Sequence, residues 1–296
     1  EFTILELYVS YKDYNWMMKM TEQLLEKVSI DSTGDTKVKI GNNDVDFKAP
    51  YERISIYEAI KKFTGIDISE MEESMLRKTA KDLNVEIDDS MGKGKIIDSI
   101  FGDKCEPNFI QPTFIIDYPK EMSPLTKVHR ENKDLTERFE LIVNGKEIAN
   151  AYSELNDPID QKERFEKQLE LSKKGDKEAG ELIDYDFLRA LEYGMPPTSG
   201  IGIGIDRLVM LMTNNSSIQE VLFFPQMRPE KKKISMNETE KLVYENISKE
   251  NQLIGELKEK IEISNKAWDK AIKSLRKLEL IKVEKIENDI YISKIN

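Results

Sequence analysis

The sequence of 296 residues contains one cysteine, Cys105, and one histidine, His129. These counts exclude a disulfide framework, a zinc site built from cysteine and histidine, and a mechanism that needs two histidines. No apolar run approaches the length needed to cross a bilayer, and the first ten residues lack the basic start and apolar block of a signal peptide. We therefore expect a cytoplasmic protein whose chemistry depends on carboxylates, arginines and a metal ion bound by carboxylates.

Basic residues are outnumbered by acidic ones, 45 to 56, which gives a formal net charge of −11. This balance argues against a uniformly basic surface for nucleic-acid binding, but it allows a local basic patch. With 34% charged and 39% hydrophobic residues, a chain of this length can bury a substantial core. It can form one large domain, alone or with a small second domain.

The most unusual local pattern is the glycine alternation Gly200-Ile201-Gly202-Ile203-Gly204. An extended segment of this kind has one face without side chains, so a flat ligand or another backbone can approach closely. Asp206 and Arg207 follow where the segment turns into a predicted helix, and helix amide groups can face an anion together with an arginine. Tight packing of a glycine-rich strand under a helix explains the spacing equally well.

The first ten residues have the alternation of a β-strand. Pleating places two sets of side chains on opposite faces, Phe2, Ile4, Glu6 and Tyr8 on one and Leu5, Leu7 and Val9 on the other. We expect the aliphatic face to join the core. The mixed face, with an aromatic ring, a carboxylate and a phenol, suits a pocket, although an ordinary half-exposed strand has the same pattern.

A β-hairpin is predicted around Asn144-Gly145, a strong two-residue turn signal between two alternating runs. In that register Glu140 faces Ala149 and Ile142 faces Glu147, so Glu140 and Glu147 lie diagonally on one face with Cβ atoms about 7 Å apart. Two carboxylates at this separation suit Mg²⁺, which prefers one or two carboxylates plus phosphate oxygens. A solvated charged face is the alternative.

Asn150, Tyr152 and Glu154 continue the second strand of this hairpin with period two. Strict pleating places Asn150 on the face opposite Glu147. A bulge or bend near Ala149 is therefore required if these side chains line one pocket.

The rest of the first 230 residues contains further helices and strands and one isolated histidine. We expect His129 to be a surface residue of a polar loop without a catalytic task. Periodicity predicts helices at 14–28, over most of 55–100, at 161–173 and at 187–193, a hairpin at 37–47, and buried strands at 111–119 and 221–225.

Residues 235–296 combine three helical segments (238–248, 252–262 and 265–280) with a final hairpin at 282–292, the order of a winged helix-turn-helix. The third helix has two stripes, an apolar one of Trp268, Ile272, Leu275 and Leu278 and a basic one of Lys266, Lys270, Lys273 and Lys277. The basic stripe could contact phosphates. Because this segment has twelve basic and twelve acidic residues, simple solvation of the helix explains the stripe equally well.

Several of these stretches resemble motifs of one family. Residues 1–8 resemble the second half of motif 2 of the class II aminoacyl-tRNA synthetases, and Gly202-Ile203-Gly204-Ile205-Asp206-Arg207 resembles their motif 3. Residues 122–125, 150–157 and 223–229 are similar to the lysyl-tRNA synthetases in particular. The similarity extends from Glu1 to about Pro229.

The resemblance implies an α+β fold, an antiparallel sheet of the class II synthetase type with flanking helices. It implies a catalytic domain at residues 1–230. It does not extend to the rest of the chain, where the residue pattern alone predicts a linker at 231–234 and a small winged-helix-like extension at 235–296. The implied reaction is the ATP-dependent activation of L-lysine to lysyl-adenylate and its transfer to tRNA(Lys), in a homodimer.

The resemblance also implies roles for individual residues. The ATP site would consist of Phe2, Gly202, Gly204 and Arg207, with the adenine between Phe2 and Arg207. Arg207, Glu140 and Glu147 would be the catalytic residues, and the two glutamates would hold Mg²⁺. The lysine pocket would be formed by Glu6, Tyr8, Asn150, Tyr152 and Glu154.

Three parts of the family pattern have no counterpart in this sequence: the OB-fold anticodon domain, motif 1, and the first strand of motif 2 with its arginine. We therefore expect a carboxy-terminal fragment of a longer protein, unable to form lysyl-adenylate alone. Two other hypotheses stay open. One is a catalytically inactive, synthetase-like binding or regulatory protein, and the other is a nucleic-acid-binding role of the tail.

Overall fold

The computed structural model describes the chain except for residues 1, 174–179, 181, 227–235, 287–288 and 296. The chain separates into two compact units, Glu1–Gln226 and Met227–Asn296. In the described part of the chain, no helix is both long and apolar enough to cross a membrane.

The first unit is built on a six-stranded sheet with the strand order β1-β8-β7-β6-β5-β4. Neighbouring strands in it are antiparallel except β4 and β5, which are parallel. This arrangement confirms the predicted sheet with flanking helices, in which antiparallel pairing dominates. The strands are β1 (Ile4–Ser10), β4 (Glu52–Ser55), β5 (Thr113–Ile116), β6 (Arg138–Val143), β7 (Lys146–Ser153) and β8 (Thr198–Gly204).

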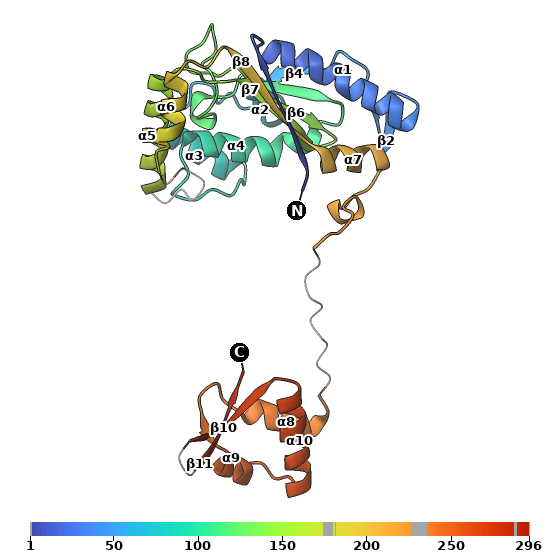
Figure 1. Ribbon diagram of the computed structural model, residues 1–296, viewed down its shortest axis with the longest axis vertical. Helices are drawn as coiled ribbons and strands as arrows, with labels where there is room; N and C mark the ends of the chain where they lie inside the picture. The colour runs from blue at the N-terminus through green and yellow to red at the C-terminus, as the bar shows by residue number, and fades with distance from the viewer. Residues whose placement is uncertain (1, 174–179, 181, 227–235, 287–288, 296) are drawn as a thin grey trace. The chain divides into compact units, whose positions relative to one another are not determined.

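One face of the sheet is covered by helix α1 (Tyr14–Thr33), which Figure 1 shows along the strands. Met17 and Leu25 are fully buried there, because apolar residues at helical spacing form one side of the helix. The helix begins after Asp13, whose carboxylate caps it, and ends at Gly34, where the positive φ of 87° suits glycine. The same core includes α7 (Ile205–Thr213) and the predicted hairpin, now β2 (Lys37–Ile40) and β3 (Asn43–Asp46).

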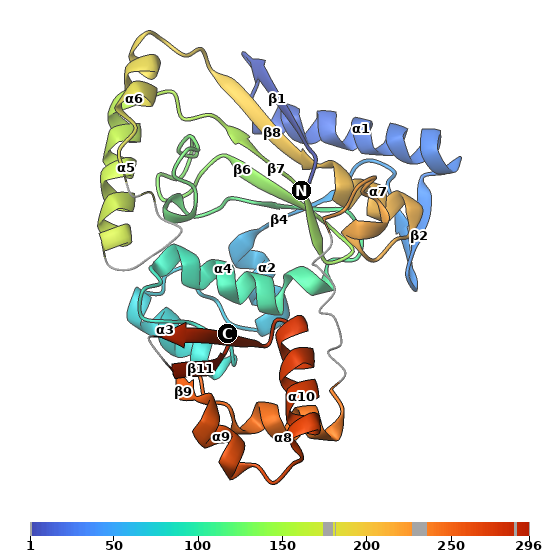
Figure 2. The same cartoon turned by 60° about the horizontal axis from the view of Figure 1, so that its bottom comes forward.

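Three helices cover part of the other face, the part formed by β4, β5 and β6 (Figures 1 and 2). Ile115 of β5 and Ile142 of β6 are buried against these helices. The same face continues over β7, β8 and β1, and the candidate site lies there. The three helices are α2 (Ile56–Thr64), α3 (Glu73–Asp82) and α4 (Lys93–Lys104), followed by the short 3-10 turns η1 (Glu106–Asn108) and η2 (Lys120–Met122).

Two further helices, α5 (Pro158–Lys173) and α6 (Tyr185–Glu192), lie side by side at one end of the first unit (Figure 2). After α7 the chain forms one short 3-10 turn, η3 (Ile218–Glu220). The prediction of a buried strand at 221–225 is wrong. Phe223 and Phe224 are 95% and 89% exposed, because no strand of the described residues pairs with this segment.

The prediction for the aliphatic face of the first strand is also wrong in part. Leu5 and Leu7 are 39% and 36% exposed, whereas Val9 packs against the core. The reason is that β1 is an edge strand, paired with β8 on one side only.

The second unit has its own core around Trp268, Leu275 and Val243. Its three helices and final hairpin lie close to their predicted positions, and the short strand β9 completes a sheet in the order β10-β11-β9. Leu278, the last residue of the predicted apolar stripe, is 37% exposed, and helix α10 ends one residue before it. The predicted linker at 231–234 lies outside the described residues. The elements are α8 (Glu238–Asn246), β9 (Gln252–Leu253), α9 (Ile254–Lys260), α10 (Asn265–Lys277), β10 (Ile281–Ile286) and β11 (Asp289–Lys294).

Candidate active site

Strand pairing brings the predicted site residues into two rows across the open face of the sheet. The first row, from β1 to β6, is Glu6, Gly202, Asn150 and Glu140. The next row along the strands is Tyr8, Gly200, Tyr152 and Arg138. Because β8 contributes a glycine to both rows, no side chain of β8 separates the side chains of β1 from those of β7 on this face.

A β-bulge in β7 aligns these rows. Ile142 pairs with Glu147 as predicted, but Leu141 pairs with Ala149, so Ile148 is the extra residue. Ile148 and Ala149 both belong to the core beneath α1. Glu147 and Asn150 therefore share the open face, and the bulge required near Ala149 is confirmed.

The same bulge overturns one detail of the predicted register. Glu140 lies opposite Asn150 and not opposite Ala149, because the extra residue shifts the pairing by one position. The shift places the Glu140 carboxylate beside the Asn150 amide, with 3.3 Å between Asn150 Nδ2 and Glu140 Oε1.

A cavity of about 440 Å³ opens where β1, β7 and β8 meet α7. Phe2 lies at it with 69% of its surface exposed, and Asp206 ties the start of β1 to α7 by accepting a hydrogen bond from Thr3 N at 2.5 Å. Predicted site residues supply much of its lining: Phe2, Glu6, Glu147, Asn150, Gly202, Gly204 and Arg207.

Arg207 and Glu147 are joined directly at this cavity. Arg207 Nη1 donates to the Glu147 carbonyl at 2.6 Å and lies 3.4 Å from its Oε2. Glu147 N in turn donates to Glu106 Oε1 at 3.3 Å. Burial, and then the charge of Glu147, raise the pKa of Glu106. Glu106 was not predicted, because it comes from η1, distant in sequence from both partners.

Arg138 is a second residue that the sequence did not indicate. Its Nη2 donates to Glu140 Oε1 at 2.5 Å and its Nε to Asn150 Oδ1 at 3.2 Å. Burial raises the pKa of Glu140 to about 7, and the Arg138 charge opposes this rise. Arg138 thus holds together one carboxylate of the predicted metal pair and one amide of the predicted lysine pocket.

Tyr8 and Tyr152 of the second row stand beyond the cavity, and Glu154 follows directly after the end of β7. Burial raises the pKa of Glu154 to about 7, and burial followed by the Glu154 charge raises that of Tyr152 to about 12. Burial and then Glu6 raise the pKa of Tyr8, whose hydroxyl lies 3.4 Å from Glu6 Oε2. Among the described residues Glu154 Oε1 is buried without a hydrogen-bond partner. A buried carboxylate oxygen in this state is costly unless a cation or donor meets it.

A comparison with known protein families identifies the family of the chain. Residues 1–228 match the model of the tRNA synthetases class II (D, K and N). The chain belongs to this family.

Close relatives of this class II synthetase chain carry the name lysine–tRNA ligase. The protein of Christiangramia forsetii is 60% identical over 286 residues, 96% of this chain and 50% of its own length. That of Porphyromonas gingivalis is 69% identical over 231 residues, 78% of this chain and 40% of its own length. That of Azobacteroides pseudotrichonymphae is 66% identical over 231 residues, 78% of this chain and 46% of its own length. The chain thus spans about half the length of these relatives, or less.

The candidate site contains carboxylates of the kind that bind a magnesium ion together with phosphates. Within the described ranges, no group of three or more histidine, cysteine, aspartate or glutamate side chains could hold a metal. Of the predicted pair, Glu147 lines the cavity, whereas Glu140 lies outside its lining and is paired with Arg138. Mg²⁺ keeps several waters and is commonly held by one or two carboxylates plus substrate phosphates.

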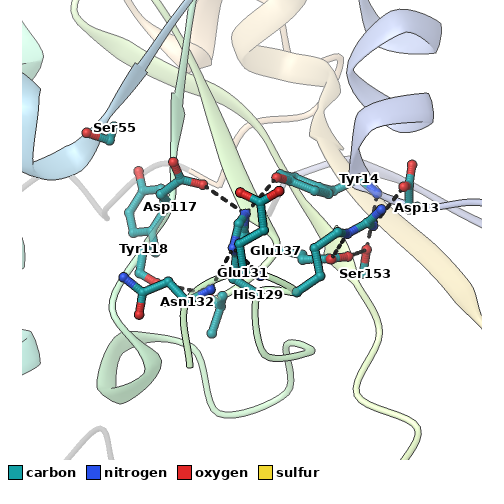
Figure 3. Close-up of polar contacts among 12 residues, drawn as sticks. Asp13, Tyr14, Ser55, Asp117, Tyr118, His129, Glu131, Asn132, Glu137 and Ser153 are labelled. Atoms are coloured by element: carbon teal, nitrogen blue, oxygen red, sulfur yellow. Dashed lines mark hydrogen bonds and ion pairs between the residues drawn. The ribbon is translucent and has the colours of Figure 1, made fainter. Parts of the chain in front are cut away.

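His129 lies outside the predicted synthetase site, in a polar cluster at the start of α1 (Figure 3). The expected surface position is wrong, since its side chain is only 15% exposed. Nδ1 accepts hydrogen bonds from the backbone N–H groups of Glu131 and Asn132, at 3.2 and 3.3 Å. Nε2 lies 3.4 Å from Tyr14 Oη and 3.8 Å from Asp117 Oδ1. Because Nδ1 accepts both of these hydrogen bonds, the tautomer that fits this geometry carries a proton on Nε2.

Proposed function

We propose that this chain forms the ATP- and lysine-binding part of a lysine–tRNA ligase. The reaction is the activation of L-lysine by ATP to lysyl-adenylate, followed by transfer of the lysyl group to tRNA(Lys). The observation that carries the proposal is the Glu154 carboxylate, which has one buried oxygen without a hydrogen-bond partner. It lies over β8 at Gly200, where the strand has no side chain.

The family comprises enzymes for aspartate, lysine and asparagine, and the charge of the pocket favours lysine. Glu6 and Glu154 would repel the carboxylate of aspartate, and the neutral amide of asparagine would leave them without a cation. The ammonium of lysine can satisfy both carboxylates and the Tyr8 hydroxyl. Buried groups built for one substrate reject an analogue strongly when that analogue leaves them unpaired. The printed names of the relatives favour the same amino acid.

ATP is proposed to bind in the cavity at the start of α7. Phe2 and Arg207 would enclose the adenine, above the part of β8 where Gly202 and Gly204 expose the backbone. Arg207 also reaches Glu147, so the nucleotide and the metal carboxylates share one contact network. Mg²⁺ bound at Glu140 and Glu147 would neutralise phosphate charge.

The proposed chemistry needs no protein nucleophile. A carboxylate oxygen of lysine forms a bond to the α-phosphorus of ATP, and the bond from that phosphorus to pyrophosphate breaks. The residues of this chain contribute by orienting the two substrates and by placing charges, which are the main requirements of such displacements. This suits a chain with one cysteine and one histidine, the latter placed away from the site.

The remaining parts of the proposal concern the whole protein. We propose a cytoplasmic, homodimeric enzyme in which residues 1–230 belong to the catalytic domain and residues 235–296 form a winged-helix-like extension. A regulatory protein without catalysis is less well supported, since it has no physical need for a buried, unpartnered carboxylate. We also propose that the 296 residues alone do not form lysyl-adenylate, because Arg207 is the only basic residue among the described residues of the cavity lining.

Calorimetric titration of the chain with L-lysine, L-aspartate and L-asparagine tests the proposal. We expect lysine alone to bind, and E154Q to weaken its binding by more than about tenfold through loss of the charged partner. Binding of aspartate or asparagine as tight as that of lysine would contradict the proposed function.

A further inference from the structure

Gly200, Gly202 and Gly204 of β8 lie on the open face of the sheet. They differ in the atoms that an added side chain would contact. A Cβ atom at Gly202 would have only Ile4 Cγ2 nearby, at 4.0 Å, and one at Gly204 would meet Arg207 Cδ at 3.5 Å. Both distances are ordinary van der Waals contacts. A methyl group therefore fits at Gly202 and at Gly204 without displacing a described residue.

Gly200 leaves space that the protein itself occupies. A Cβ atom there would overlap Glu154 Oε1 and would lie 2.8 and 2.9 Å from the Cε1 and Cδ1 atoms of Tyr8. Tyr8 and Tyr152 are its cross-strand neighbours on β1 and β7. Since β8 is paired on both sides, its backbone cannot withdraw, and an added methyl group would have to displace Glu154 or Tyr8.

We propose that Gly200 is a specificity-determining residue of the amino-acid pocket, because only a residue without a side chain lets the Glu154 carboxylate and the Tyr8 ring close over β8. Gly202 differs in that its missing side chain leaves room for a ligand. The identity of the amino acid rests on the proposed function, but the packing role of Gly200 does not.

The test compares G200A with G202A in titrations with L-lysine and with Mg·ATP. G200A is expected to weaken lysine binding by more than about tenfold, since it moves the buried charged partner, and to change Mg·ATP binding by less than about twofold. G202A places its methyl group in the cavity proposed for ATP and is expected to weaken Mg·ATP binding. The melting temperature of the G202A chain without ligand is expected to equal that of the wild-type chain. G200A is expected to lower that melting temperature.

A double variant separates displacement of Glu154 from general damage to the sheet. E154D shortens the carboxylate side chain by one methylene group and withdraws it from residue 200. In the G200A background E154D is expected to raise the melting temperature and to recover part of the lysine affinity, although it weakens lysine binding in the wild-type background. Such a change of sign is a direct coupling between the two positions.

Three results would overturn the inference: unchanged lysine binding in G200A, equal losses of lysine and Mg·ATP binding, or additive effects of G200A and E154D. If G200A does not fold, recovery of folding in the double variant supports the inference and failure to recover overturns it. If the wild-type chain binds no lysine, the proposed function fails. The Gly200 inference is then decided by the melting temperatures of the same variants.

Discussion

At the scale of single residues, Glu154 links the electrostatics of the pocket to its proposed ligand. Its pKa is raised to about 7 by burial, so the unliganded carboxyl group is largely protonated at about pH 6 and must lose its proton to pair with an ammonium group. Lysine binding is therefore expected to strengthen about tenfold between about pH 6 and about pH 8, with proton release at the lower pH. Calorimetry in buffers of different ionisation enthalpy measures both effects.

Two variants serve as controls for this prediction. E154Q removes the titrating group and is expected to remove the pH dependence. E140Q removes the other carboxyl group whose pKa is raised to about 7, and it should keep the pH dependence of lysine binding. Persistence of the dependence in E154Q would show that another group is responsible.

Residue-level prediction from sequence succeeds where a residue type and its position in a strand determine its surroundings. Alternation placed Glu6 and Tyr8 on one face of β1 together, and the register of β1 confirms that they share a face. Arg138 and Glu106 could not be predicted in this way. Their contacts with Glu140 and Glu147 depend on the hairpin register and on the position of η1, which no local pattern encodes.

At the scale of secondary-structure elements, β7 shows how far sequence patterns extend. The need for a bulge followed from the polar residues on either side of Ala149, and the structure places the extra residue at Ile148. The apolar run at 221–225 shows the converse. Its composition is that of a buried strand, but within the part of the chain that the structure describes no strand pairs with the exposed Phe223 and Phe224. Strand pairing is a property of the whole fold and not of the segment alone.

The start of α1 provides a prediction about stability. Asp13 Oδ1 accepts a hydrogen bond from Trp16 N at 3.1 Å, and Asp13 Oδ2 pairs with Arg130 Nη2 at 2.9 Å. Because D13N keeps the capping oxygen and D13A removes it, we expect D13A to lower the free energy of unfolding by about 1–2 kcal/mol and D13N by less than about 1 kcal/mol. Urea unfolding followed by circular dichroism measures both. Equal losses in the two variants would assign the effect to the ion pair and contradict the capping role.

At the scale of the whole molecule, the sequence predicted a change of pattern near residue 235, and the chain forms two compact units, Glu1–Gln226 and Met227–Asn296. The match to the C. forsetii protein covers 96% of the chain and therefore includes most of the second unit. The family model ends at residue 228. The described residues that line the cavity of the candidate site all belong to the first unit.

The most direct test of the account is a structure of the chain with bound L-lysine. We expect the ε-ammonium group within about 3.2 Å of Glu154 Oε1, the oxygen that has no hydrogen-bond partner in the unliganded protein. We also expect the α-carboxylate to point toward the cavity lined by Arg207 and Glu147. Lysine bound elsewhere, or bound with its ammonium group away from Glu154, would contradict the account.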